Sequence, residues 1–207
     1  MAPVSETAPA FFDNAAIRRK DLAWNDWPAV AAFLDDQAVC RLAAVDSPYP
    51  YVSALSYRLE GDAFLIHFSR NGRLATLLAA DPHVTLEVSQ AISLLKAPAA
   101  QNTSMEYRSV VARCTAELTL LDLDIETQQY EALEKYRPER DYLPIDRERA
   151  TRAIVACRAR IVSLSAKKRV LADGQFGASG IDPGYARYEF PAPPALSSLP
   201  AEAFRPR

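Results

Sequence analysis

Apolar side chains recur along the chain with two periods, one typical of helices and one typical of strands. The first helical pattern follows Asn25 and Asp26, either of which can act as the N-cap, and Pro28 suits the first turn because its missing N–H is not needed there. Its apolar face is formed by Trp27, Val30, Phe33 and Leu34. A helix is therefore predicted to begin near residue 27.

Strand-like segments with polar turns between them make up most of the chain after this helix. The predicted strands are 38–45, 51–59, 63–68, 83–90, 107–120 and 153–164. Further helical segments are predicted after residue 72, over 124–136 and over 147–151, with Asp81-Pro82 ending the first of them. A loop is expected over about 91–105. Short connections between successive strands favour antiparallel pairing.

These elements predict an α+β or mainly β barrel. Residues 1–20 are interpreted as an N-terminal arm and 21–169 as the folded domain. The segment 170–207 contains four of the six glycines and six of the fifteen prolines, so we expect a tail that is not part of the barrel core. Its aromatic residues favour docking onto a neighbouring surface over full disorder.

The composition of the chain argues against several classes of function. Hydrophobic residues make up 49% of the 207 residues, which argues against disorder of the whole chain. Lys plus Arg number 24 and Asp plus Glu 26, so the net charge of −2 gives no bulk attraction for nucleic acid. No apolar stretch approaches the roughly 20 residues that a membrane span needs. The N-terminus has no signal-peptide pattern, so a cytoplasmic protein is expected.

Cysteine and histidine are too sparse for a structural zinc site or a His-rich metal site. Cys40, Cys114 and Cys157 form no C-x-x-C pair and lie in apolar runs, which favours small buried side chains over a disulfide framework or a zinc site. His67 and His83 are the only histidines. No metal site is predicted.

The segment SRNGR, residues 69–73, lies between a predicted strand and a predicted helix. A helix N-terminus offers unpaired N–H groups and the positive end of a dipole, which suit a phosphate group. Ser69 or Asn71 could cap the helix, Gly72 allows close backbone approach, and Arg73 adds a charge. The same residues also fit a solvated, capped turn with a surface arginine, and the segment alone leaves both interpretations open.

Three longer segments, taken in order, resemble the sequence pattern of a known protein family. They are PYVSALSYRLEGDAFLIHFSRNGRLATLLAADPHVTLEV, YRSVVARCTAEL and IVACRARIVSLSAKKR. In this order they resemble the pyridoxamine 5'-phosphate oxidase-like split β-barrels that bind FMN, nearest the nitroimidazole-resistance, or flavin-nucleotide-binding, branch. The resemblance covers about residues 21–169. Leu74 and Arg113-Cys114 depart from it, since the family commonly has Lys and Gly at the corresponding positions.

The resemblance implies a flavin site between two subunits of a homodimer. The second strand would follow the isoalloxazine edge with Val52, Ser53, Ala54 and Ser56. His67, Phe68 and Ser69 would lie beside the ring and the ribityl chain. Asn71, Gly72 and Arg73 would meet the phosphate, with Arg73 as the principal cation. Ser109 and Val110 would approach the ring from the neighbouring strand.

The resemblance further implies an FMN-dependent oxidoreductase that transfers a hydride from a nicotinamide nucleotide to a small molecule. Two alternatives stay open: a flavin-binding protein without enzymatic activity, and a haem-binding protein with His67 or His83 as the ligand. His67 itself has three interpretations, as a residue packed near the flavin, as a structural histidine, or as a catalytic acid or metal ligand.

Overall fold

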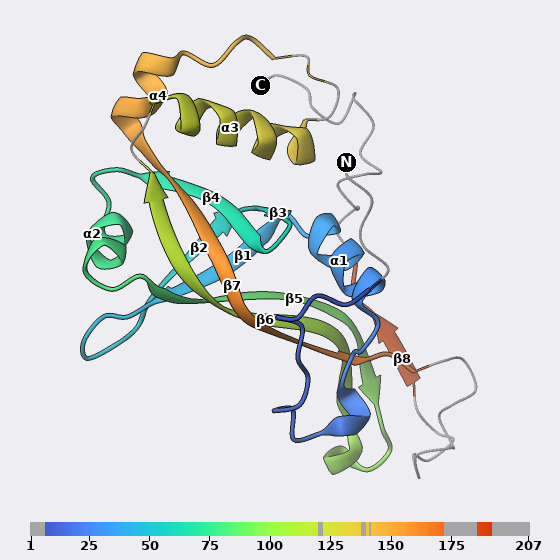
Figure 1. Cartoon of the computed structure of the whole chain (residues 1–207). Helices are drawn as coiled ribbons and strands as arrows, with labels where there is room; N and C mark the ends of the chain where they lie inside the picture. The colour runs from blue at the N-terminus through green and yellow to red at the C-terminus, as the bar shows by residue number, and fades with distance from the viewer. Residues whose placement is uncertain (1–6, 120–121, 138–139, 141, 172–185, 192–207) are drawn as a thin grey trace.

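The chain forms one antiparallel sheet that curls into a half-barrel, with helices packed around it (Figure 1). The structure, a computed structural model, describes residues 7–119, 122–137, 140, 142–171 and 186–191. Its strands are β1 (Val39–Ala44), β2 (Tyr51–Ser56), β3 (Arg58–Glu60), β4 (Ala63–Ser69), β5 (His83–Lys96), β6 (Ser104–Thr119), β7 (Ile154–Arg169) and β8 (Ala186–Glu189). Its α-helices are α1 (Trp27–Asp36), α2 (Arg73–Ala80), α3 (Asp122–Tyr136) and α4 (Arg147–Ala153). The predicted mainly β architecture with flanking helices is confirmed.

The order of the strands leaves one gap in the curled sheet. The order is β2-β1-β5-β6-β7-β4-β3, with β8 added on β5, and every pair is antiparallel. Cα atoms of β2 and β4 approach within 8 Å, although these two fully described strands share no ladder. We call this gap between β2 and β4 the seam.

The concave face of the sheet holds the main core. As predicted, α1 buries Trp27, Val30 and Leu34, and the Asp26 side chain accepts a hydrogen bond from the Ala29 N–H at its N-cap. Leu74 and Leu78 of α2 join the same core. The strands contribute the apolar side chains that alternate along them, and these side chains point towards the helices on the concave face.

On the convex face, α3 covers β4 and β7. Leu65 of β4 and Ile125 of α3 are fully buried, although Leu65 points away from the main core. Gln128 ties the helix to the sheet, because its side-chain amide donates to the Ile66 carbonyl at 2.9 Å and to the Cys157 carbonyl at 3.0 Å. The helix predicted over 124–136 is thus confirmed as a layer outside the barrel.

The remaining convex face, on β1, β2, β5 and β6, is not covered by any part of the chain that the structure describes. Val39 is 46% exposed, Val52 57% and Val111 40%. The strand registers place these residues on one face, together with Arg41 and Glu87, which form an ion pair at 3.1 Å. We call this surface the open face.

Two predicted elements are wrong in their extent. The strand predicted over 51–59 is two strands, because β2 pairs with β1 whereas β3 pairs with β4. Tyr57 lies between them, fully buried, and its backbone N–H donates to the Tyr136 hydroxyl at 2.7 Å. The loop expected over 91–105 is mostly strand, since β5 continues to Lys96 and β6 begins at Ser104.

Both ends of the chain lie against the sheet where they are described. The N-terminal arm follows the part of β7 that β4 leaves unpaired, with the Asp13 N–H on the Leu164 carbonyl and the Trp24 N–H on the Ala166 carbonyl, both at 2.9 Å. In the tail, β8 pairs with β5 from Ser93 to Lys96. None of the described helices has the length and apolarity that a bilayer crossing requires.

Candidate functional site

Two of the predicted site segments lie on β2 and β4, the strands on either side of the seam. On β2, Val52, Ala54 and Ser56 point to the convex side, whereas Ser53 is half-buried on the opposite side. Because β2 ends the sheet and pairs with β1 alone among the described strands, its other edge faces the seam. Backbone donors and acceptors along this edge are therefore available to a ligand that lies between β2 and β4.

The end of β4 supplies the second segment. His67 is half-buried, its ring makes no hydrogen bond to a described residue, and burial lowers its pKa, which favours the neutral imidazole. Phe68 is 8% exposed and its side chain packs in the core. Ser69 is exposed at the end of the strand.

The turn over 69–72 leads directly into α2. The expected capping by Ser69 or Asn71 is wrong: Gly72 is the N-cap residue and no side chain caps the helix. The Gly72 N–H donates to the Ser69 carbonyl at 3.1 Å, and a Cβ at position 72 would lie 3.2 Å from that oxygen. The close turn therefore favours glycine and leaves the first N–H groups of α2 available to an anion.

Arg73 begins α2 but already has a partner. Its guanidinium lies 2.5 Å from Asp46 and 5.8 Å from the centre of the Tyr51 ring, and its side chain is 63% exposed. Asp46 lies in the connection after β1, so the ion pair joins this connection to the start of α2. A phosphate at this turn must compete with Asp46 for Arg73.

The structure separates the last two predicted residues. Val110 is 1% exposed and packs in the core, so its side chain does not reach the convex side. Ser109 is half-buried and belongs to the open face, opposite Ser89. Three strand spacings, about 14 Å, separate β6 from β2, which is too far for both strands of one subunit to contact the same part of a flavin ring.

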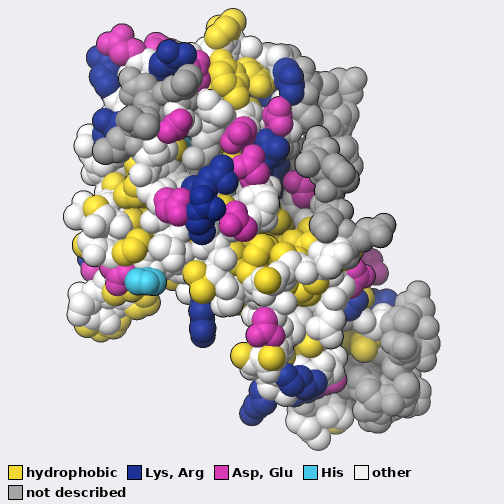
Figure 2. Space-filling model, in the orientation of Figure 1, with side chains coloured by type: hydrophobic (Ala, Val, Ile, Leu, Met, Phe, Trp, Pro, Cys, Tyr) yellow, Lys and Arg dark blue, Asp and Glu magenta, His cyan; other side chains and the backbone are white. Residues whose placement is uncertain are grey.

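A hollow of about 400 Å³ lies elsewhere, between α3 and the ends of β6 and β7. Acidic and basic side chains alternate over this part of the surface (Figure 2). Its arginines are already paired, Arg158 with Glu60 at 2.7 Å and Arg160 with Glu117 at 2.6 Å. These pairs leave little charge for a phosphate, so the turn beside the seam is the better candidate.

The family model for pyridoxamine 5'-phosphate oxidase matches residues 26–168. The chain belongs to this family. The match spans α1 to β7 and therefore includes the seam, the 69–72 turn and the open face, so the resemblance seen in the sequence is confirmed. The sequence has no match among the curated proteins.

Solved structures share the fold of this pyridoxamine 5'-phosphate oxidase family member. The flavocytochrome Anf3 from Azotobacter vinelandii is 24% identical with a TM-score of 0.69, covering 88% of this chain and 90% of that one. A FAD and haem binding protein from Mycobacterium smegmatis is 19% identical with a TM-score of 0.65, covering 86% and 90%. A putative 5-nitroimidazole antibiotic resistance protein from Bacteroides thetaiotaomicron is 16% identical with a TM-score of 0.61, covering 70% and 86%. The predicted split β-barrel is confirmed.

One residue of the turn was missed by sequence reasoning. Arg70 lies between Ser69 and Asn71, and its backbone N–H donates to the Ala153 carbonyl at 3.0 Å. Two of its guanidinium nitrogens are buried without a hydrogen-bond partner among the described residues. The SRNGR segment contains two arginines, but nothing in it indicates that Asp46, 27 positions away, occupies the second one.

Proposed function

We propose that the chain binds a flavin, specifically FMN, at the seam and catalyses hydride transfer from a nicotinamide nucleotide to a small-molecule acceptor. The observation that carries this proposal is the uncapped N-terminus of α2 behind the tight 69–72 turn, in a chain of this family. A flavin phosphate fits there because several N–H groups and the helix dipole act on it together.

The residues of the chain have distinct roles in this proposal. The 69–72 turn and Arg73 hold the phosphate, and the free edge of β2 offers backbone groups to the ring. FMN, when bound, supplies the hydride chemistry. The protein positions the ring, limits the access of water and leaves one face for the substrate. The identity of the acceptor depends on residues that line this face.

A homodimer completes the site. Ser109 and the edge of β2 cannot meet on one ring within a subunit, but a second copy packed on the open face brings β6 of one chain towards β2 of the other. Val39, Val52 and Val111 give that face its exposed apolar surface. Symmetric dimers use such self-complementary patches. The three buried, unpaired cysteines favour a reducing compartment, the cytoplasm.

Titration of the purified protein with FMN tests the cofactor, followed by anaerobic addition of NADH or NADPH. We expect about one FMN per chain and bleaching of the flavin absorption by one of the nucleotides. No binding at tens of micromolar FMN contradicts the cofactor assignment. Binding without reduction by either nucleotide would place the protein among flavin carriers or sensors.

A second candidate function, haem binding, is favoured by the state of His67. Its imidazole is half-buried, makes no hydrogen bond to a described residue and is held neutral by burial, which lowers its pKa, as an iron ligand must be. His83 is less suited, because its side chain is 76% exposed and its Nδ1 lies 2.7 Å from Asp81. A Soret band that appears with hemin and disappears in His67→Ala would support this function.

A further inference from the structure

Arg70 carries a charge that has no partner among the residues that the structure describes. Its Nε and Nη2 atoms are buried and make no hydrogen bond within the described ranges. A guanidinium stays protonated at any pH that a folded protein survives, so burial cannot neutralise it. Buried donors without acceptors are rare and costly, and such a group points to a missing partner. The residue as a whole is half-buried, so part of it remains accessible to solvent.

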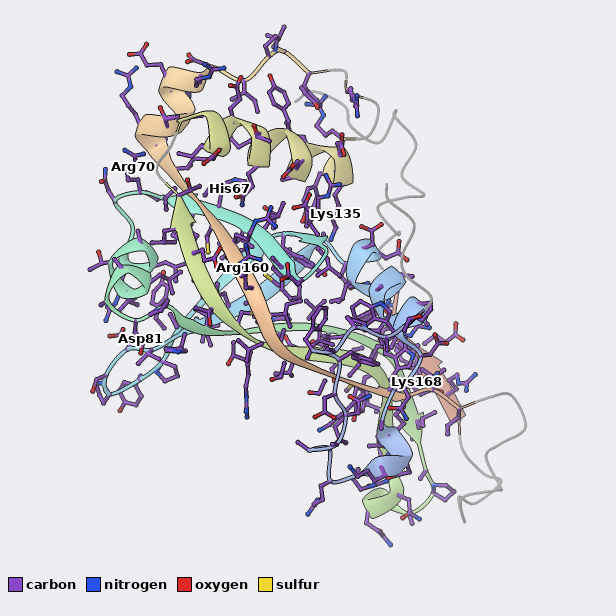
Figure 3. The ribbon with its side chains drawn as sticks, in the orientation of Figure 1. His67, Arg70, Asp81, Lys135, Arg160 and Lys168 are labelled. Carbon is purple, nitrogen blue, oxygen red and sulfur yellow. The ribbon has the colours of Figure 1, made fainter. Side chains whose placement is uncertain are left out.

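The position of Arg70 links this charge to the candidate phosphate site. The residue lies in the turn that ends at the uncapped N-terminus of α2, three residues after His67 and three before Arg73. Its backbone is fixed by the bond to Ala153 at the end of α4. Figure 3 shows Arg70 and His67 at the end of β4, beneath α3 and α4.

Arg70 and Arg73 differ in whether an existing partner competes with an anion for the guanidinium. An anion that recruits Arg73 must displace Asp46, which lies 2.5 Å away and is itself only 17% exposed. An anion that recruits Arg70 displaces no described partner of Nε or Nη2 and relieves the cost of leaving these donors unpaired. Both effects favour Arg70, although Arg73 is the more exposed residue.

We propose that Arg70 is the principal residue that pairs with the anionic group of the ligand bound at this turn, with Arg73 in a secondary role. The chemistry required is an oxyanion that accepts charge-assisted hydrogen bonds, which a flavin phosphate and a haem propionate both supply. The inference rests on the proposed function in placing a ligand at the 69–72 turn, and it assigns the counter-charge to a residue that the family resemblance did not indicate.

Arg70→Met separates a binding role from a structural one, because methionine keeps much of the length of the side chain without its charge. In the ligand-free protein, the unfolding temperature should be equal to that of the wild type or higher, since an unpaired buried charge is removed. The affinity for the ligand should fall about 10- to 100-fold, the range for lost hydrogen bonds to a charged group. Arg73→Met should weaken binding less, and Arg149→Met, at an exposed position on α4, is the control.

The measurements use three probes on each variant: FMN, hemin and inorganic phosphate, the last followed by thermal shift. If Arg70→Met weakens the binding of FMN but not of hemin, the anionic group that Arg70 pairs with is a phosphate. If it weakens the binding of hemin but not of FMN, that group is a carboxylate. If the wild type binds neither cofactor but phosphate raises its unfolding temperature and fails to do so in Arg70→Met, the inference stands and the proposed function fails. Wild-type affinity in a folded Arg70→Met, a marked loss of ligand-free stability in that variant, or a wild type that responds to no probe would overturn the inference.

Discussion

Burial determines the chemistry of the three thiols in this chain. Cys40, Cys114 and Cys157 lie in the core, and burial raises the pKa of each to about 12. The thiolate is the reactive form, so its population at mildly alkaline pH is very small. The prediction from the sequence that these residues are small buried side chains is confirmed.

We therefore predict that all three thiols are protected in the folded protein. A thiol reagent such as DTNB should label none of them within minutes in buffer and all three in guanidinium chloride. Rapid labelling of one thiol in the native protein would contradict the packing described for that residue.

His67 makes stability depend on pH in a defined direction. Burial lowers its folded-state pKa below the ordinary value of 6.5, so the unfolded chain binds the extra proton first as the pH falls. The contribution of His67 to stability is complete above pH 6.5 and decreases below it, until the pH reaches the folded-state pKa. Its slope is at most about 1.4 kcal/mol per pH unit.

We predict that His67→Gln flattens the dependence of the unfolding free energy on pH below 6.5. Urea unfolding at several pH values measures this effect. His83→Gln is the matched control, because it removes an exposed imidazole. An equal flattening in both variants would show that the buried position of His67 is not the cause.

Among single residues, the sequence predicted the turn before α2 but not the partners of the charged side chains around it. The 69–73 turn was recognised from strand, glycine and arginine in succession. The roles of its two arginines depend on Asp46 and on the burial around Arg70, and neither is a property of the local sequence.

At the scale of elements, local patterns predicted helices well and strand limits less well. The cap and apolar face of α1 are local features, and both are confirmed. Tyr57 interrupts the strand predicted over 51–59 because it bonds to α1 and α3, its hydroxyl to the Leu34 carbonyl and its N–H to the Tyr136 hydroxyl. Such contacts between distant segments cannot be read from periodicity.

The tail strand β8 is held by a buried carboxylate. Glu106 is 1% exposed and lies 2.9 Å from Arg187 Nε. It also accepts hydrogen bonds from the Ser93 hydroxyl at 2.5 Å and from the Leu171 N–H at 2.7 Å. These contacts join β8, β5, β6 and the residues just after β7 at one point. The aromatic residues of the tail predicted that it would dock, but nothing in the sequence indicated that Glu106 would hold it.

We predict that Arg187→Met lowers the free energy of unfolding by about 3 kcal/mol, because Glu106 loses its counter-charge while it stays buried. If β8 instead undocks and exposes Glu106 to water, the loss should equal the smaller free energy of docking β8. Urea unfolding and limited proteolysis between residues 171 and 186 measure the two outcomes. Adding Glu106→Gln should restore part of the loss. Glu189→Gln, on the exposed side of β8, is the control, and an equal effect there would contradict the anchor.

For the whole molecule, the proposed homodimer would account for both the open face and the seam. Helices α1 and α2 pack on the concave face and α3 covers β4 and β7 on the convex face, but the covering by described residues stops at β1, β2, β5 and β6. The uncovered strands contain both the free edge of β2 and Ser109. A second copy on this face would bury the exposed valines and complete the flavin site in the same step.

We predict that Val111→Lys converts a dimer into a folded monomer of 22.8 kDa and weakens FMN binding at the same time. Val111 is 40% exposed at the centre of the open face, where a dimer would bury it and an added charge would have to be desolvated. Sedimentation velocity gives the mass and a flavin titration gives the affinity. Leu143→Lys, at an 89% exposed position between α3 and α4, should change neither. A wild-type protein that is monomeric at micromolar concentration and still binds FMN would show that one subunit holds the flavin alone, with Ser109 outside the site.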